Sequence, residues 1–275
     1  MAQLDGRVAF ISGGARGQGR SHAVALAREG CDIAVFDITS SLPAVPYPLA
    51  TSDDLAETVK RVEAVGRRCI SIVGDVRSSA DVDGAVAETV ERLGGLHIVV
   101  TNAGVIEYST VETCTDEAWE TVLGTNLTGE FKVLRAAIPR LKAQGFGRII
   151  TVASMAARQA YPNLPHYVAA KWGVVGLTKA LAQELGGTGI TVNTICPASL
   201  NSDMFVNDAT VRLFFPNEPA ATVADLRARQ PATLTGVSML EPEHTSRAVV
   251  YLATDPGVLT GQVMEIGNGS SAYLT

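Results

Sequence analysis

Short apolar runs alternate with longer amphipathic stretches along the chain, from residue 8 to residue 266. Several of the runs are continuous in Val and Ile, which is typical of parallel strands buried on both faces of a sheet. Parallel strands need a crossover between them, so the alternation predicts a doubly wound α/β fold with helices on both faces of the sheet. Seven strands are expected, at residues 8–12, 32–36, 68–73, 98–101, 148–152, 191–196 and 262–266.

Two segments interrupt this alternation. Residues 38–52 follow the second expected strand and contain three prolines, which exclude a helix or a central strand there. Residues 198–241 form a long connection, and their Phe side chains favour a lid over a substrate site rather than disorder. No linker or internal repeat divides the chain, so residues 1–275 are expected to form a single domain.

Polar residues mark where several helices begin. Ser78 and Asp81 match a capping box that opens one helix. Thr51 or Ser52 is expected to cap the helix that follows the proline-rich segment. The helix after the first strand is expected to run to about Glu29.

The balance of charge excludes several classes of protein. The formal net charge is −6 and no run of basic residues occurs, so the chain lacks the footprint of a nucleic-acid-binding protein. The longest apolar stretches are well short of the ~20 residues that span a membrane. No leader pattern follows Met1, so a cytoplasmic protein is expected. The His and Cys residues are scattered without ligand spacing, so no metal is expected.

A glycine-rich turn joins the first expected strand to the first helix. Gly13, Gly17 and Gly19 permit a tight turn through which backbone N–H groups and the helix N-terminus can approach a pyrophosphate. Asp37 ends the second strand 18 residues after Gly19, where a carboxylate can accept hydrogen bonds from a ribose. Alone, such a turn is often a flexible loop and such an Asp is often a cap. In this strand-turn-helix context they predict a Rossmann-like dinucleotide site.

The spacing Gly13-x-x-x-Gly17-x-Gly19 resembles the pattern of the short-chain dehydrogenase/reductase family, and the resemblance covers essentially the whole chain. Thr101 departs from it where Asn is usual, and Ser202 stands where Thr is more common. The resemblance implies a cofactor site made of Gly13, Arg16, Gly17, Gln18, Gly19, Asp37, Ile38, Asp75, Val76, Asn102, Ala103, Gly104, Tyr167, Lys171, Pro197, Leu200 and Ser202.

Two charged residues give opposite indications about the cofactor. Asp37 would repel a 2′-phosphate, which indicates NAD, whereas Arg16 sits where NADP-dependent relatives keep a basic residue. We give Asp37 more weight, because a carboxylate at the ribose meets an added phosphate at short range. A loop Arg can instead turn to solvent or pair with an acid. NAD is therefore the expected cofactor.

Catalytic chemistry is indicated by Ser154, which closes the fifth expected strand, and by Tyr167 and Lys171 in the helix that follows. Residues four apart share a helix face, and a neighbouring ammonium lowers the pKa of a phenol from its usual ~10. Tyr167 could then exchange a proton with an alcohol or ketone. The resemblance implies that Ser154 bonds the substrate oxygen, that Lys171 also holds the nicotinamide ribose, and that Asn126 supports a water relay behind Lys171.

Each of these residues alone has an ordinary explanation, as a surface pair or a strand-end cap. Their joint occurrence behind a nucleotide motif makes catalysis the better interpretation. His166 adjoins Tyr167 but faces another way, so it is expected at the surface or in packing. Trp119 and Trp172 are expected to pack against helices, and Phe131 to lie in the core or in a subunit contact.

The expected function is the NAD-dependent interconversion of a small apolar secondary alcohol and its ketone. The lid is aromatic and aliphatic, and no Arg or His near the catalytic residues could bind a carboxylate. A 3-oxoacyl thioester reductase shares the fold and catalytic set, but Asp37 and the acidic charge argue against it. A catalytically silent NAD-binding sensor is the third alternative, and the presence of Tyr167 and Lys171 argues against it.

The proline-rich insertion resembles that of the actinobacterial carveol dehydrogenase-like subgroup, which is linked to the peptide-derived redox carrier mycofactocin. Because residues 38–52 begin beside Asp37, we expect them to form a flap that covers NAD and slows its release. An ordinary surface loop is the alternative. If the flap retains NAD, electrons would leave to an external redox carrier.

The family resemblance also implies a homotetramer, through helices that begin near Thr115 and Pro162 and through the C-terminal strand and tail.

Overall fold

The computed structural model describes residues 3–230, 233–269 and 272. Its strands are parallel and form one seven-stranded sheet in the order β3-β2-β1-β4-β5-β6-β7. The predicted strands are confirmed, with ends shifted by at most one residue. The strands are β1 (Val8–Ser12), β2 (Asp32–Asp37), β3 (Cys69–Val73), β4 (Ile98–Thr101), β5 (Gly147–Val152), β6 (Ile190–Pro197) and β7 (Val263–Ile266).

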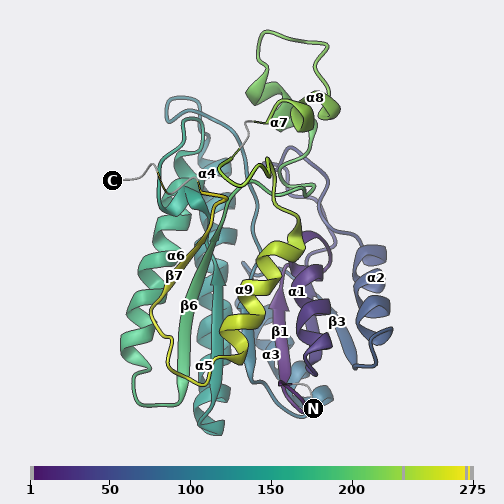
Figure 1. The fold of residues 1–275 in the computed structure, drawn as a ribbon, viewed down its shortest axis with the longest axis vertical. Helices are drawn as coiled ribbons and strands as arrows, with labels where there is room; N and C mark the ends of the chain where they lie inside the picture. The colour runs from purple at the N-terminus through teal and green to yellow at the C-terminus, as the bar shows by residue number, and fades with distance from the viewer. Residues whose placement is uncertain (1–2, 231–232, 270–271, 273–275) are drawn as a thin grey trace.

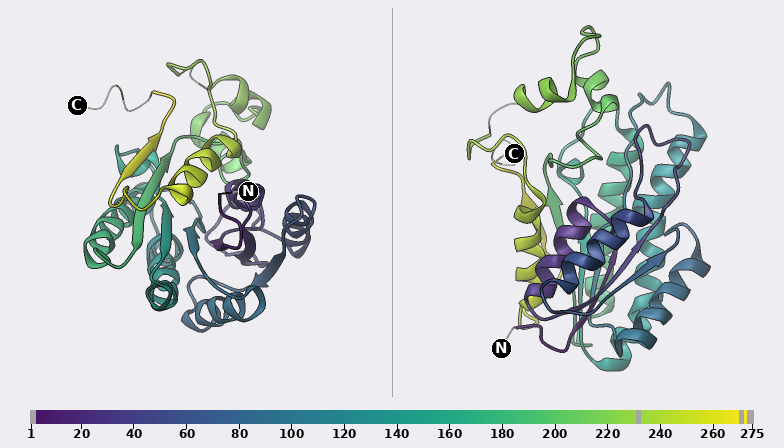
Figure 2. Two further views of the ribbon diagram at one scale, coloured as in Figure 1. Left: turned by 60° about the horizontal axis from the view of Figure 1, so that its bottom comes forward. Right: turned by 90° about the vertical axis from the view of Figure 1, so that its right-hand side faces the viewer.

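Helices cover both faces of this sheet (Figure 1 and Figure 2). One face packs against α3, α5 and α6, and the opposite face packs against α1, α2 and α9. The fold is therefore the predicted Rossmann-like single domain. The helices are α1 (Gly17–Arg28), α2 (Ser52–Glu63), α3 (Ser79–Leu93), α4 (Asp116–Leu123), α5 (Glu130–Gln144), α6 (Pro165–Glu184), α7 (Asp208–Phe214), α8 (Val223–Ala228) and α9 (Pro242–Thr254).

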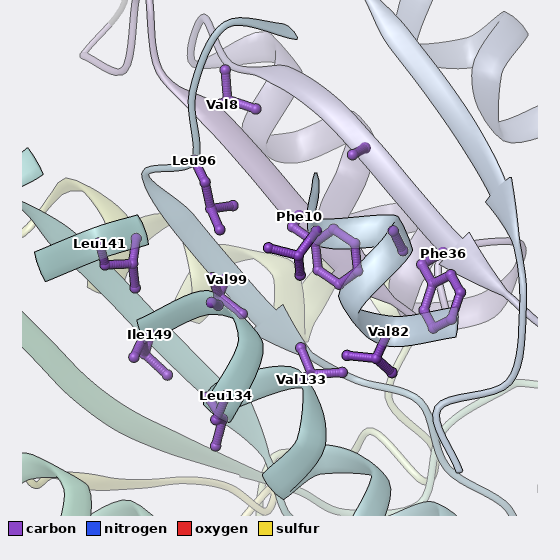
Figure 3. Packing of buried hydrophobic residues seen from close by; sticks show 14 of the residues in the cluster. Val8, Phe10, Phe36, Val82, Leu96, Val99, Val133, Leu134, Leu141 and Ile149 are labelled. Atoms are coloured by element: carbon purple, nitrogen blue, oxygen red, sulfur yellow. The ribbon is translucent and has the colours of Figure 1, made fainter. Parts of the chain in front are cut away.

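Alternation along each strand builds two separate cores. Phe10 of β1 faces the side of α3, α5 and α6, whereas its neighbour Ile11 faces the side of α1, α2 and α9. Figure 3 shows the first of these cores, where Phe10, Val99 and Ile149 from three neighbouring strands meet side chains of α3 and α5. Since both faces are apolar, the central strands read as the continuous Val and Ile runs seen in the sequence.

The helix caps agree with the sequence in part. Thr51 caps α2 with a complete capping box, in which the Thr51 and Asp54 side chains each accept from the other residue's backbone N–H. Ser78 caps α3 by accepting from the backbone N–H of Asp81. The reciprocal bond of a capping box is absent there, because the Asp81 carboxylate instead accepts from the backbone N–H of Asp75 at 3.0 Å.

The helix expected after Thr115 is interrupted. A π-helical turn, η1 (Gly124–Gly129), joins α4 to α5. At Gly129 an added Cβ would lie 2.7 Å from Cγ2 of Val76, so the turn packs unusually close to the loop after β3. Such turns are frequent at functional sites.

Both interrupting segments lie at the carboxyl ends of the strands. The insertion at 38–51 contains no helix or strand, as predicted, whereas the predicted lid contains the short helices α7 and α8. These two helices stand above the carboxyl ends of the strands in Figure 1. Residues 231–232 of the lid, and residues 270–271 and 273–275 of the tail expected in subunit contacts, lie outside the described residues.

Two aromatic side chains correct the sequence interpretation, and a third decides between two alternatives. Trp119 of α4 and Trp172 of α6 were expected to pack against helices, yet 41% and 48% of their surface is exposed in this single chain. Phe131 of α5 is 44% exposed, which excludes the core and leaves the other expected alternative, a subunit contact. Within the described part of the chain, no helix has the length and hydropathy needed to cross a membrane.

Candidate active site

Two adjoining cavities open at the carboxyl edge of the sheet. The first, which we call the cleft, has a volume of about 130 Å³ and is lined by the glycine-rich turn, Asp37 and the segment after β4. The second, which we call the pocket, has a volume of about 460 Å³ and lies beneath the lid. Gln18, Ser202 and Met204 line both cavities and so mark where they meet.

Most residues of the predicted cofactor site line the cleft. These residues are Gly13, Arg16, Gly17, Gln18, Asp37, Ile38, Asp75, Val76, Asn102, Ala103, Gly104 and Ser202. Tyr167, Pro197 and Leu200 line the pocket instead, and Lys171 is buried behind it. Gly19 lines neither cavity. It closes the turn, because an added Cβ would lie 1.9 Å from the carbonyl oxygen of Gly13.

The glycine-rich turn is built to receive an anion. Helix α1 begins at Gly17, whose φ of +53° favours glycine. A Cβ added at Gly17 would have the Ser202 side chain as its nearest neighbour, at the ordinary contact distance of 3.8 Å. The helix N-terminus directs its free backbone N–H groups and positive end toward this opening. The amide oxygen of Gln18 is buried there without a hydrogen-bond partner. The N–H groups fit a pyrophosphate, whereas the Gln18 oxygen is an acceptor and fits a hydroxyl or N–H group of a ligand.

Asp37 offers carboxylate lone pairs to the cleft. Its two oxygens accept from the backbone N–H groups of Ala15 and Ile38, each at 2.9 Å. Burial raises the pKa of Asp37 to about 6, although these two N–H groups oppose the shift. A carboxylate has about four acceptor positions, so others remain for a ribose diol.

Arg16 lines the cleft and has partners in two other segments. Its guanidinium forms an ion pair with Asp203 of the lid at 3.1 Å. It also donates to the carbonyl oxygen of Pro48 in the insertion at 2.5 Å. Arg16 thus joins the lid to the insertion and pairs with an acid, as the weight given to Asp37 expects.

The candidate catalytic residues meet at the wall of the pocket. Tyr167 and Lys171 lie one turn apart on α6, with the Lys171 ammonium 5.8 Å from the Tyr167 ring centre. Ser154 begins the short 3₁₀ turn η2 (Met155–Ala157) after β5, and its hydroxyl accepts from the backbone N–H of Ala156 at 3.1 Å. Lys171 donates to the carbonyl oxygen of Val152 at 2.7 Å. The three side chains therefore converge from two neighbouring elements.

Burial dominates the protonation of this group. It raises the pKa of Tyr167, and a hydrogen bond from Ser154 opposes the shift. It lowers the pKa of Lys171, and the charge of Glu130 opposes that shift. Ionisation of Tyr167 therefore depends on positive charge close to its hydroxyl group.

Asn126 lies in the π-helical turn and is fully buried. Its side-chain oxygen accepts from the backbone N–H of Val105, and its side-chain nitrogen donates to the Val105 carbonyl, both at 2.8 Å. An added Cβ at Gly104 would lie 3.3 Å from the Asn126 oxygen and 3.8 Å from the Lys171 nitrogen. The Asn126 side chain thus fixes the chain after β4 beside Lys171.

Several residues of the two cavities were not predicted. Leu42, Tyr47 and Leu49 of the insertion line the cleft, and the Tyr47 hydroxyl accepts from the backbone N–H of Ile106 at 3.0 Å. The only available signal for these residues was the position of the insertion after Asp37.

His166 is fully buried, which agrees with a packing role and excludes a surface one. Its Nε2 lies 2.9 Å from a carboxylate oxygen of Glu107, and its Nδ1 accepts from the backbone N–H of Tyr167. The ring therefore caps the start of α6. It is held away from the hydroxyl group of Tyr167.

The pocket is apolar. None of the described residues that line it is charged, and the lid contributes Met204, Phe205, Leu213 and Phe214. The hydroxyl of Tyr108 forms a 2.8 Å hydrogen bond with that of Thr210, which fastens α7 over the pocket. Such a pocket accepts a neutral ligand whose polar group reaches Ser154 and Tyr167.

Known proteins with similar sequences cover the whole chain. The sequence matches the short chain dehydrogenase family over residues 7–211. An uncharacterized NAD-dependent oxidoreductase of Mycobacterium tuberculosis is 43% identical over 273 residues, which cover 98% of each chain. (-)-trans-Carveol dehydrogenase of Rhodococcus erythropolis is 36% identical over 275 residues, which cover 98% of this chain and 99% of that one.

A solved structure gives the same result for the fold. Carveol dehydrogenase from Mycobacterium avium, in complex with NAD, superposes with a TM-score of 0.95 at 39% identity, covering 99% of this chain and 100% of that one. Fold and sequence thus agree over nearly the full length. The chain belongs to the short-chain dehydrogenase family, and within it is similar to the carveol dehydrogenases.

Proposed function

We propose that this protein is an NAD-dependent dehydrogenase that interconverts a small apolar secondary alcohol and its ketone. The observation that carries the proposal is that Ser154 and Tyr167 line an uncharged pocket that adjoins the cleft, with the buried Lys171 one helical turn from Tyr167. A dye-linked screen of secondary alcohols tests it. Cyclic apolar alcohols should reduce the dye, whereas alcohols that carry a carboxylate should not.

NAD, when bound in the cleft, accepts the hydride that the alcohol carbon loses. The chain's own residues handle the proton. Ser154 hydrogen-bonds the substrate oxygen, and Tyr167 takes the hydroxyl proton as the carbon–oxygen double bond forms. Lys171 supplies the positive charge that favours the phenolate of Tyr167. In the reverse direction Tyr167 returns the proton to the ketone oxygen.

Exchange of Asp37 for Ser should move the cofactor preference toward NADP. The change removes a carboxylate that repels a 2′-phosphate, and like charges brought together cost several kcal/mol. The ratio of NADP to NAD affinity, measured by calorimetry on protein stripped of cofactor, should rise about ten- to a hundredfold. Asp53→Asn, at an exposed acid in the first turn of α2, is the control and should leave the ratio unchanged. An unchanged ratio in Asp37→Ser would contradict the role of this carboxylate.

The insertion is proposed to retain NAD. Leu42, Val45 and Tyr47 are buried against Val105 and Ile106 after β4, so the segment is packed down rather than free at the surface. Arg16 fastens the same segment to the lid through Pro48 and Asp203. With NAD held beneath these contacts, electrons would leave to an external redox carrier.

The protein is also proposed to be a homotetramer. Trp119, Phe131 and Trp172 expose apolar surface on α4, α5 and α6, and a monomer would leave all three in water. Light scattering at micromolar concentration should give the mass of a tetramer. Phe131→Glu combined with Trp172→Glu should give smaller species, whereas Val73→Glu, at an exposed residue of the edge strand β3, should not. A monomeric wild-type protein would contradict the proposal.

A further inference from the structure

A row of hydroxyl groups crosses the sheet behind the candidate catalytic residues. Ser12, Thr101, Thr151 and Thr194 are register partners on four neighbouring strands. Register partners in a parallel sheet share a face, and here this is the face covered by α5 and α6. The polar row therefore lies between the sheet and the helix that carries Lys171.

A buried carboxyl group contacts this row. Glu130, the first residue of α5, is 4% exposed, and its Oε1 accepts from the Thr101 hydroxyl at 2.5 Å. Thr101 stands where the family usually has Asn, and in this chain its hydroxyl group donates to Glu130. Unpaired Glu is almost never fully buried, because burial disfavours its charged form.

Lys171 reaches the same part of the sheet as Glu130, because its nitrogen contacts the carbonyl of Val152, the residue after Thr151, which is the register partner of Thr101. Burial raises the pKa of Glu130, and Lys171 lowers it; burial lowers the pKa of Lys171, and Glu130 raises it. The two groups do not form a direct ion pair, and the Lys171 nitrogen donates to the Val152 carbonyl. The remaining titratable groups of this region are the Cys196 thiol on β6 and Tyr167 itself. Glu130 is thus the anion that compensates the buried ammonium.

We propose that Glu130 is a positioning residue that acts through Lys171, by holding that side chain in its ammonium form. The inference rests on the proposed function, in which the Lys171 charge favours proton acceptance by Tyr167. Without the Glu130 carboxylate, Lys171 would be a buried cation without a counter-charge, which favours loss of its proton. Tyr167 would then accept a proton only at higher pH.

Glu130→Gln removes the charge and keeps an oxygen that can accept from Thr101. The pH profile of kcat/KM for alcohol oxidation should move to higher pH by roughly one unit, which lowers kcat/KM about tenfold on its acidic limb. A direct effect of Glu130 on Tyr167 has the opposite sign, since removing a nearby negative charge would move the profile to lower pH. A purely structural role would leave the profile in place.

Two further variants keep the test decisive if Glu130→Gln folds poorly. Thr101→Val leaves the carboxyl group but removes its hydrogen bond, so a smaller shift in the same direction is expected. Glu88→Gln removes an exposed carboxylate that pairs with Arg92 on α3, and it should shift nothing. An unmoved or acid-shifted profile in both the Glu130 and Thr101 variants would overturn the proposal.

A readout without substrate separates this inference from the proposed function. Tyrosinate absorbance is titrated in each protein and in the same protein with Tyr167→Phe, so that the difference reports Tyr167 alone. An alkaline shift in Glu130→Gln supports the inference even if no alcohol is oxidised. An unshifted titration, in a protein that does oxidise alcohols, overturns the inference and leaves the function standing.

Discussion

Tyr167→Phe is expected to lower the turnover of alcohol oxidation by about 10²–10⁴-fold, the usual effect of losing a general base. The change removes one hydroxyl oxygen and keeps the ring that packs against the buried residues of the insertion and of the segment after β4. Binding of NAD should persist, because the cleft is built mainly from the glycine-rich turn, Asp37 and the residues after β3 and β4. Steady-state rates with the best alcohol of the screen, together with NAD content, measure both effects.

Tyr108→Phe is the matched control. Tyr108 lines the same pocket, but its hydroxyl bonds to Thr210 of α7, and burial raises its pKa to about 12. Its loss should loosen the lid and raise KM with little change in kcat. Near-normal turnover in Tyr167→Phe, or an equal loss in Tyr108→Phe, would show that the proton acceptor has been misassigned.

The second large effect concerns cofactor retention. Wild-type protein is expected to keep NAD through desalting, and replacing residues 41–50 by a short Gly-Ser link should let it wash out. The replacement removes Tyr47, whose hydroxyl is tied to Ile106, and Pro48, which is tied to Arg16. It leaves the capping box at Thr51, so α2 should still form. Mass spectrometry of the desalted proteins measures the NAD that remains.

A substitution inside the insertion supplies the control for this experiment. Ser41→Ala, at an exposed position, should retain NAD as the wild type does. Tyr47→Phe loses only the bond from Ile106 and should release NAD at an intermediate rate. Wild-type protein that leaves the column without NAD and cycles freely with added cofactor would refute the flap, but not the dehydrogenase.

Local patterns predicted the fold because they coincide with the forces that form it. The run at Val8–Ser12 is apolar up to Ile11 and is buried along its whole length, so its strand was identified from end to end. The glycine-rich turn was predicted because its strand, turn and helix are adjacent in sequence. Tyr167 and Lys171 were paired for the same reason, since one helical turn separates them.

Contacts between distant segments were beyond the reach of the sequence. Thr101 and Glu130 are 29 positions apart, and their bond depends on how α5 begins after a π-helical turn. Tyr47 reaches Ile106 across 59 positions, so the prolines could place the insertion but could not show where its side chains pack. Trp172 was misplaced because the helical sequence pattern is the same whether an apolar residue of the helix faces the core or is exposed.

The central claim is that this chain moves a hydride from a small apolar secondary alcohol to NAD, with Tyr167 taking the proton. A single-turnover experiment tests it most directly: protein that carries NAD is mixed with cyclic secondary alcohols, without any electron acceptor, and fluorescence of reduced nicotinamide is followed. Reduced nicotinamide equimolar with the NAD present is expected in the wild type, and a rate lower by about 10²–10⁴-fold in Tyr167→Phe. No reduction by any such alcohol, together with NADPH-dependent reduction of 3-oxoacyl thioesters, would contradict the account.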